Sequence, residues 1–408
     1  MKQKLWMLFL RVAKALFYFV NGFWAVPAVL LMRALRPLVL VRIGTLTVLR
    51  MGHFAADAGH QYVALQGQPI NQFDLFWLPK TTCNEFWAAM VRRSFPVKGW
   101  VRYLDRWNGV IPGGSKHVRL SSTTGSRDIH GLLERHPSSM LFTPEEDKEV
   151  REWLSNFGLK EGDRFVCLLV RDQAYLDHDS LHGDNSDRSF SRWQYHSYRN
   201  SDISTYVPAM EWLASQGIWV FRMGKKMSTP IHSSNKRLID YAFREDRSDF
   251  LDVWLFAHCN LCITTGSGPD MISDVYRRPL LIVNCLPLLL IRSWSNVLNA
   301  PKHLVWKDTG RRLTCREHFE HSYQKTDEFA EAGIEIKDLS QNELHDITRE
   351  SWMRIENKWT DEQSDFNRQK KFWDNLKAFP DYAKFHGWIH PESRVSSMFL
   401  RNNPDFLN

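Results

Sequence analysis

Between Phe165 and Cys285 the sequence alternates short apolar runs with segments of helical length, and this pattern limits the possible folds more than any other feature. The apolar runs are FVCLLV, IWVFRMG, LCITTG and PLLIVNC. Strands that alternate with helices form βαβ units, in which helices cover both faces of a parallel sheet. Ligands of such sheets bind at the carboxyl ends of the strands. We therefore expect functional residues where these runs end.

Two of these strand ends lead into arginine. The first run is followed by Arg171, and the second ends in Arg222, two residues before Gly224. An arginine offers a planar fork to phosphate oxygens, and a glycine lets a ligand approach the backbone closely. Tyr198 and Arg199 follow in a polar segment that we place at the same edge. These five residues are candidates for binding a phosphate-bearing ligand, and surface ion pairs are the alternative for the arginines.

The third strand end carries a glycine turn, Thr265-Gly266-Ser267-Gly268. Its backbone N–H groups are expected to approach a phosphate, and Pro269 suits the first turn of a helix whose N-terminus attracts anions. A tight connection between strand and helix explains the same residues without a ligand. The turn lacks the lysine of a Walker loop and the GxGxxG spacing of dinucleotide-binding proteins.

Composition indicates a soluble body with anionic partners. The chain has 408 residues, enough for two ordinary domains, and 43% hydrophobic with 24% charged residues is typical of globular proteins. The net charge of +7 favours phosphate-bearing substrates or acidic lipids. No nucleic-acid-binding motif is present, so nucleic acid is not an expected partner.

The sequence offers little support for a metal site. Cys259 and Cys262 have CxxC spacing, but no second pair completes a zinc site, and we expect two buried thiols in a protein of a reducing cytosol. Asp177-His-Asp179 has the DxD form of some metal-dependent glycosyltransferases, although this spacing is common by chance in an acidic loop. We expect neither a metal nor a resident cofactor.

The first 36 residues differ from the rest. Residues 15–32 carry no charge and lie between basic residues on both sides. Eighteen residues are only just enough to span hydrocarbon, and Asn21, Gly22 and Pro27 interrupt the run. Basic residues at both ends favour a helix that lies in the membrane interface or re-enters it. A spanning anchor and a helix buried in the protein core are the alternatives.

The remaining pattern predicts domain boundaries. Pro37 opens a strand, and Arg50-Met-Gly52-His53 follows it as a loop entering a helix. Thr143-Pro-Glu-Glu146 is a capping box that begins another helix before the central stretch. The predicted parts are a membrane-associated segment (1–36), an N-terminal Rossmann-like domain (37–158), a C-terminal Rossmann-like domain (159–335) and a helical tail that packs back on the body (336–408).

Acid–base chemistry has four candidates, namely His53, Asp172, His196 and Asp202. A sugar hydroxyl loses its proton as it attacks an anomeric carbon, so a transferase benefits from a carboxylate or imidazole base. Asp202 precedes a helix and is better explained as its cap. His53 and Asp172 are therefore the preferred bases.

Several segments together resemble a known family. RMGH, HSYRNSDISTYVPAMEWL, FRMG, DFLDVWLFAHCNLCITTGSGPD and FLRNNPDFL resemble bacterial glycosyltransferases associated with surface polysaccharide synthesis. VCLLVRD and TTGSGPD also resemble the donor half of GDP-fucose-using fucosyltransferases, which implies that Arg171, Ser267 and Gly268 hold the diphosphate. The short HxR pattern of those enzymes is absent, because Leu169 stands where histidine is expected.

Both resemblances imply a GT-B fold, in which two Rossmann-like domains face a cleft, the donor binds the C-terminal domain and the acceptor binds the N-terminal one. We therefore expect a metal-independent glycosyltransferase that uses a nucleotide-sugar donor and a glycan or lipid-linked acceptor. Its expected location is the cytoplasmic face of the bacterial inner membrane. A pyruvyl transferase acting on polysaccharide precursors and a non-catalytic membrane scaffold are the alternatives.

Overall fold

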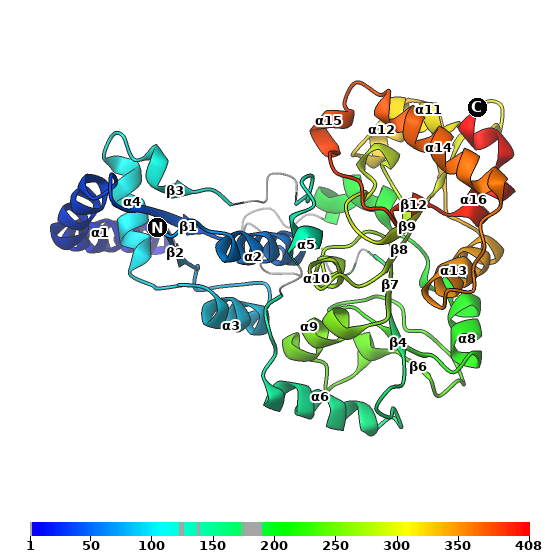
Figure 1. Cartoon of the computed structure of the whole chain (residues 1–408), viewed down its shortest axis with the longest axis horizontal. Helices are drawn as coiled ribbons and strands as arrows, with labels where there is room; N and C mark the ends of the chain where they lie inside the picture. Colours follow the sequence, from blue (N-terminus) through cyan, green and yellow to red (C-terminus); the bar gives the residue numbers. More distant parts are fainter. Residues whose placement is uncertain (1, 122–125, 137–138, 173, 175–189) are drawn as a thin grey trace. The chain divides into compact units, whose positions relative to one another are not determined.

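The chain folds as a mixed α/β protein with two compact units. The computed structural model describes residues 2–121, 126–136, 139–172, 174 and 190–408. The first unit comprises Met1–Thr124 with Ser138–Met140, and the second comprises Gly125–Pro137 with Leu141–Asn408 (Figure 1). Each unit has its own parallel sheet, as the alternation of strands and helices predicts.

The first unit is built on a small parallel sheet. Its strands are β1 (Leu40–Thr45), β2 (Gln72–Trp77) and β3 (Val118–Arg119), in the order β2-β1-β3. Its helices are α1 (Lys2–Ala34), α2 (Met51–Gln66), α3 (Glu85–Ser94) and α4 (Val101–Val110). The predicted strand after Pro37 is confirmed as β1. The loop predicted at residues 50–53 is mostly helix, because α2 already begins at Met51.

An ion-pair network ties the three strands of this sheet together. Arg42 on β1 donates to both carboxylate oxygens of Asp74, its neighbour in register on β2, at 2.7 and 2.6 Å. Arg119 on β3 lies 3.4 Å from the same carboxylate. Asp74 is only 2% exposed, and its two arginines compensate the free-energy cost of burying its charge.

Helix α1 is longer than the apolar run that predicts it, because it extends through the basic residues back to Lys2. Among the described residues, Leu16–Ala34 is the one helical segment long and apolar enough to cross a membrane. Ala25, Val29 and Met32 on this helix are nevertheless buried against the body of the first unit.

The second unit contains a seven-stranded sheet in which every neighbouring pair is parallel. Its order is β12-β9-β8-β7-β4-β5-β6. The strands are β4 (Phe165–Leu169), β5 (Trp219–Arg222), β6 (Leu238–Ile239), β7 (Leu261–Thr264), β8 (Leu280–Cys285), β9 (Val297–Pro301) and β12 (Arg394–Val395). The four apolar runs of the central stretch are thus confirmed as strands β4, β5, β7 and β8.

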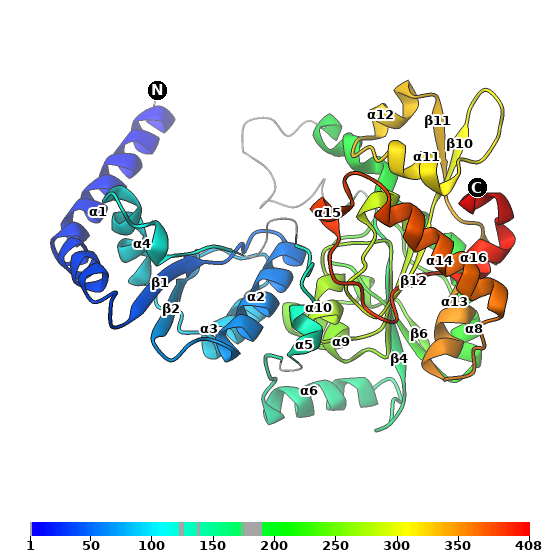
Figure 2. The ribbon, with the colours of Figure 1, turned by 45° about the horizontal axis from the view of Figure 1, so that its top comes forward.

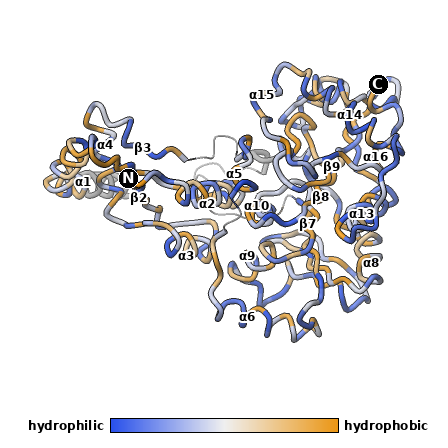
Figure 3. Tube along the Cα trace, in the orientation of Figure 1, coloured by the Kyte–Doolittle hydropathy of each residue, from blue (hydrophilic) through white to orange (hydrophobic). Residues whose placement is uncertain are grey.

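Helices cover both faces of this sheet, which explains why its central strands are continuous apolar runs. Every residue of β4, β7 and β8 is buried. Figure 1 shows α8 (Val207–Ser215) and α13 (Gln341–Ile355) on one face and α9 (Asp249–His258) and α10 (Asp270–Val275) on the other. In Figure 3 strands β7, β8 and β9 are hydrophobic, whereas α6 at the rim is mostly hydrophilic.

Helix α6 (Pro144–Ser155) belongs to the second unit, so the division falls earlier than the predicted boundary at residue 158. The predicted capping box is confirmed, since the hydroxyl of Thr143 accepts from the N–H of Glu146. The helix packs on α9, where the indole N–H of Trp254 donates to Asp147 at 2.8 Å.

The segment after residue 335 is helical but also completes the sheet. It supplies α14 (Gln363–Lys377), α15 (Tyr382–Phe385), α16 (Ser397–Asn402) and edge strand β12, in addition to α13. The remaining elements are α5 (Leu132–Arg135), α11 (Cys315–Glu320), α12 (Thr326–Glu331) and the antiparallel pair β10 (His303–Trp306) and β11 (Ile334–Lys337). This segment therefore packs as part of the second unit.

Candidate functional site

The strand order of the second unit indicates a candidate position for a ligand. Strand β4 lies between β5 and β7, and the chain passes from β4 to β5 and β6 before it returns to β7 on the other side. The connections after β4 and β7 therefore leave the sheet in opposite directions. Open parallel sheets bind ligands at the carboxyl ends of the strands at such a switch point. The residues after Leu169 and Thr264 occupy this position.

Arg171 lies at the switch point, two residues beyond the end of β4. Its backbone N–H donates to the hydroxyl of Thr265 at 3.0 Å, which joins the connections after β4 and β7. Burial lowers the pKa of its guanidinium to about 10, and the nearby positive charge of Arg199 contributes to the shift. Its Nε is buried without a hydrogen-bond partner, and no described carboxylate pairs with the guanidinium.

Arg199 approaches the same place from a different segment. It ends the 3-10 helix η2 (Phe190–Arg199), and its guanidinium donates to the carbonyl of Gly266 in the glycine turn. Two like charges near each other, with no carboxylate of the described residues beside them, raise the free energy of the ligand-free site. A phosphate dianion between them would offset the repulsion between the two guanidinium groups. It would also accept a hydrogen bond from the Nε of Arg171.

The glycine turn is closed by its own side chains, contrary to our expectation that its N–H groups face a phosphate. The hydroxyl of Thr264 accepts from the N–H groups of Gly266 and Ser267 at 3.1 and 3.4 Å, and it donates to the buried Asp270 at 2.9 Å. Gly266 has φ +73°, which explains the glycine. Thr265 is buried, whereas Gly268 is exposed. The turn therefore serves chiefly to present the carbonyl that holds Arg199.

Arg222 does not lie at the rim, so its predicted role in phosphate binding is wrong. It is the last residue of β5 and is fully buried. Its guanidinium donates to Asp240 at 3.0 Å and to the carbonyl of Thr229 at 2.9 Å. Gly224 has a structural role as well, since it has φ +155° and a Cβ there would lie 2.5 Å from Met227.

Tyr198 also differs from its predicted role. Its ring is buried in a cluster with Leu304, Leu313, Phe329 and Ile334. Burial raises the pKa of its hydroxyl. Its neighbour His196 contacts Tyr195 with ring centroids 3.9 Å apart and an angle of 38° between the ring planes. These aromatic contacts position the segment that carries Arg199.

Asp172 holds a neighbouring loop in place. One carboxylate oxygen accepts from the N–H and the hydroxyl of Ser228 at 2.8 and 2.9 Å. The other accepts from the N–H of Ala174 at 3.0 Å. Both oxygens are thus engaged with the loops that follow β4 and β5. This arrangement favours a positioning role over that of a general base.

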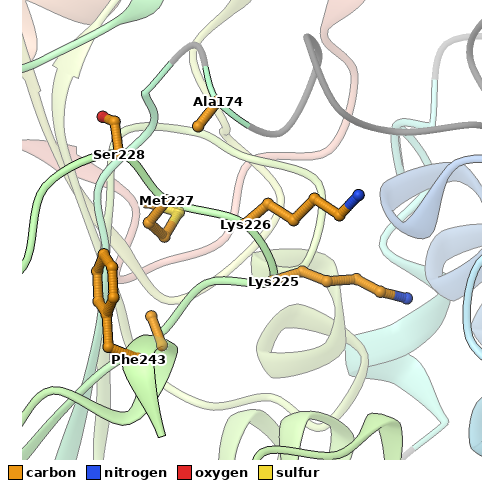
Figure 4. Close-up of a pocket in the computed structure, with 7 residues that line it drawn as sticks. Ala174, Lys225, Lys226, Met227, Ser228 and Phe243 are labelled. Carbon is orange, nitrogen blue, oxygen red and sulfur yellow. The ribbon is translucent and has the colours of Figure 1, made fainter.

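A pocket of about 520 Å³ opens beside this loop. It is lined by Ala174, Lys225, Lys226, Met227, Ser228, Ala242 and Phe243. Figure 4 shows the side chains of Lys225 and Lys226 extending in the same direction, away from the ring of Phe243. Lys225 lies 3.2 Å from Asp249, and Arg222 stacks on Phe243 at 5.2 Å from its ring centroid. The sequence interpretation missed this lysine pair, although two consecutive lysines after a strand end indicate anion binding.

His53 belongs to the first unit and is considered there alone. It lies in the first turn of α2 and is half-buried. Burial lowers the pKa of its imidazole, the charge of Arg50 lowers it further, and Asp57 opposes the shift. The imidazole is therefore neutral at pH 7 and able to accept a proton.

The other residues that the sequence singled out have structural roles. Asp202 caps the 3-10 helix η3 (Ile203–Tyr206) by accepting from Ser204 N–H at 2.9 Å, as predicted. Cys259 and Cys262 are buried free thiols, also as predicted. In the part of the chain that the structure describes, no three His, Cys, Asp or Glu residues are grouped to hold a metal. The Asp177–Asp179 pair lies outside the described residues.

No family model matches this chain, and no curated protein matches it either. Two solved structures show a distant similarity, both at 12% sequence identity. One is the ADP-heptose LPS heptosyltransferase II of E. coli, with a TM-score of 0.33 over 59% of this chain and 84% of the enzyme. The other is a glycosyl transferase of family 9 from Veillonella parvula DSM 2008, with a TM-score of 0.37 over 64% of this chain and 86% of that one.

Proposed function

We propose that this protein is a glycosyltransferase of the GT-B type, which transfers a sugar from a nucleotide-sugar donor bound to its second unit. The observation that carries the proposal is Arg171, a half-buried guanidinium with a buried Nε, at the switch point of a parallel sheet and with no described anionic partner. A structural arginine in the same fold, Arg222, also has a buried Nε without a partner, but both of its terminal nitrogens are hydrogen-bonded within the protein and one of them pairs with Asp240. The contrast between them supports a ligand at Arg171.

The donor diphosphate would lie between Arg171 and Arg199. During transfer the bond between the anomeric carbon and the diphosphate oxygen breaks, so negative charge grows on the leaving group. Two fixed guanidinium groups stabilise that charge without reorganising, which lowers the barrier. The nucleoside would occupy the lysine-lined pocket, where Phe243, 46% exposed, offers a ring face to a base.

The acceptor would bind the first unit. His53 is our candidate base, because its lowered pKa keeps the imidazole neutral and ready to take the proton of the attacking hydroxyl. We propose a glycan or lipid-linked acceptor in bacterial surface polysaccharide synthesis, at the cytoplasmic face of the inner membrane. The reaction is proposed to need no metal.

Nucleotide binding tests the proposal directly. Thermal unfolding is measured with UDP, GDP, CMP and ADP for the natural protein, for Arg171→Ala and for Arg316→Ala. Arg316 is a matched control because its side chain is 80% exposed and makes only a weak contact with Glu320. One nucleotide should raise the Tm of the natural protein and of Arg316→Ala but not of Arg171→Ala. If no nucleotide raises the Tm, the protein is better explained as a scaffold.

Donor turnover separates the two enzyme classes that we consider. A glycosyltransferase should slowly release the nucleoside diphosphate from its nucleotide sugar in the absence of acceptor. A pyruvyl transferase should bind phosphoenolpyruvate and release no nucleotide. Release of nucleotide that is lost in Arg171→Ala and retained in Arg316→Ala supports the glycosyltransferase.

A further inference from the structure

Helix α1 has two apolar faces, and the protein covers only one of them. Gly22, Ala25, Val29 and Met32 are buried, at the spacing of a single helical face. The opposite face is apolar and exposed. It comprises Leu16 (61% exposed), Phe19 (62%), Val20 (55%), Phe23 (76%), Leu30 (51%) and Leu31 (60%). An exposed apolar surface of this extent is unusual on a soluble protein and marks an interaction site.

Both ends of this apolar segment are fastened to helix α4. Near its start, Tyr18 contacts Tyr103 at a centroid distance of 5.7 Å, and Trp107 donates to the carbonyl of Tyr18 at 3.4 Å. Near its end, Arg33 donates to the carbonyls of Asn108 and Ile111, both at 2.9 Å. Figure 2 shows that α1 bends and that the part after the bend lies beside α4, whereas its N-terminal part extends beyond α4.

This packing distinguishes a helix that spans the membrane from a helix that lies on its surface. A helix that crosses a bilayer must have lipid around its whole circumference or other apolar spans beside it. Helix α1 instead packs one face on α4 and β1 of the first unit, and β1 also carries the Arg42–Asp74 ion pair, which cannot enter hydrocarbon. The exposed face is therefore available to a membrane only if the helix lies parallel to its surface.

Side chains around the exposed face suit the boundary between water and lipid. Trp24 and Trp100 are 39% and 45% exposed and contact each other at a centroid distance of 6.3 Å. Tryptophan is favoured at membrane interfaces. The sequence of α1 carries Lys2, Lys4, Arg11, Lys14 and Arg33 and no acidic residue. Such a charge favours anionic lipid headgroups over a second copy of this basic chain.

We propose that the exposed face of α1, flanked by the exposed Trp100 and Val110 of α4, binds an anionic lipid bilayer with the helix axis parallel to the membrane surface. The protein is then monotopic, and its first unit sits on the membrane. The inference is independent of the proposed transferase activity, because neither the argument nor its test uses a nucleotide or a substrate.

Sedimentation with vesicles tests the surface. The full chain is mixed with vesicles of phosphatidylcholine alone or with phosphatidylglycerol, and the natural protein is compared with Phe23→Glu/Leu31→Glu. Ile70→Glu is the matched control, because Ile70 is fully exposed outside this face. The double variant should reduce the partition coefficient at least about tenfold and the control should not, since carboxylates oppose both apolar burial and anionic headgroups. Equal binding of all three proteins overturns the proposal.

Depth measurements separate the parallel geometry from a spanning helix. All six native cysteines are buried, so Leu16→Cys, Phe23→Cys and Leu31→Cys each introduce one accessible thiol. A fluorophore at each position is quenched by lipids carrying spin labels at different depths. The parallel geometry predicts the same shallow depth, roughly 5–10 Å below the headgroups, at all three positions. A depth that varies through the bilayer centre contradicts it.

The same variants test whether a second copy of the chain covers this face. Sedimentation velocity without lipid should show that the natural protein and Phe23→Glu/Leu31→Glu have the same oligomeric state. An oligomer that dissociates only in the double variant, together with no vesicle binding by the natural protein, assigns the face to self-association and overturns the proposal.

Discussion

One carboxylate oxygen of Asp172 accepts hydrogen bonds from both the backbone N–H and the hydroxyl of Ser228, and it thereby ties the loop after β5 to the loop after β4. Ser228 lines the pocket that we assign to the nucleoside. Asp172 thus determines the shape of the donor site although it need not touch the reacting atoms.

Replacing Asp172 should therefore weaken donor binding more than it slows the reaction. We expect Asp172→Ala to raise the Kd of the nucleotide about tenfold, because the pocket loop loses two hydrogen bonds at about 1 kcal/mol or less each. Turnover at saturating donor should fall much less than the 10²–10⁴-fold, roughly, that follows from loss of a general base. Calorimetry and steady-state kinetics measure the two effects. Ser228→Ala, which keeps the backbone bond, should show a smaller change in the same direction.

Removing the charge of Arg171 should stabilise the ligand-free protein. Arg171→Met deletes a half-buried cation whose pKa is lowered to about 10 by desolvation and by the charge of Arg199. We expect the free energy of unfolding to rise by about 1–3 kcal/mol, while nucleotide binding is lost. Urea denaturation measures the first effect, and Arg316→Met should leave the stability unchanged. A less stable Arg171→Met would show that the guanidinium has a structural partner.

Arg222 should behave in the opposite way. Arg222→Met leaves Asp240 without its buried cation, so we expect a loss of about 3–5 kcal/mol in the free energy of unfolding. The double variant Arg222→Met/Asp240→Asn should recover part of this loss, because neither charge is then left unpaired. Nucleotide affinity of the folded variants should fall much less than in Arg171→Ala, because Arg222 reaches the pocket only through its contact with Phe243. A large loss of affinity at normal stability would restore Arg222 as a ligand-binding residue.

Stability should decrease in acid because of two buried histidines. Burial lowers the pKa of His318 to about 3 and that of His386 to about 4, where Arg127 also contributes. The unfolded state therefore takes up protons first as the pH falls below 6.5, and the folded state loses about 1.4 kcal/mol per pH unit for each histidine. For His386 this loss ends near pH 4.

The variant His386→Gln tests the assignment, because a glutamine can accept from Ser293 and donate to the Leu289 carbonyl as the neutral imidazole does. The pH dependence of the free energy of unfolding between pH 6.5 and 4 should become shallower by about 1.4 kcal/mol per unit. An unchanged slope in urea denaturation at several pH values would mean that His386 is protonated in the folded state.

The parallel sheet of the second unit could be predicted because its central strands are buried on both faces and so appear as uninterrupted apolar runs. Strand β12 could not, since two residues, Arg394 and Val395, carry no such pattern and pair with β9 only in the folded chain. The extent of α1 was missed for a related reason, because its first residues are basic and only its later part is apolar.

Arg171 and Arg222 show what the sequence could not predict. Arg171 and Arg222 both follow apolar runs, yet Arg222 is still within its strand, opposite Leu168 in register, whereas Arg171 lies beyond the end of β4. A shift of two residues relative to the end of the strand thus separates the buried arginine from the one at the switch point. Likewise, the sequence TTGSGPD suggests free N–H groups, but the Thr264 hydroxyl takes up two of them.

Strand β12 closes the edge of the large sheet with residues that follow β9 by more than ninety positions, as the pairing of Arg394 with Leu298 shows. Such a distant pairing raises the contact order of the second unit, and a higher contact order slows folding. A ribosome must have released residue 395 before the sheet can be finished, so this unit matures only late in translation. Until then the backbone N–H and C=O groups on the outer edge of β9 have no strand to pair with. This exposed edge is a site where a chaperone can bind the incompletely folded chain.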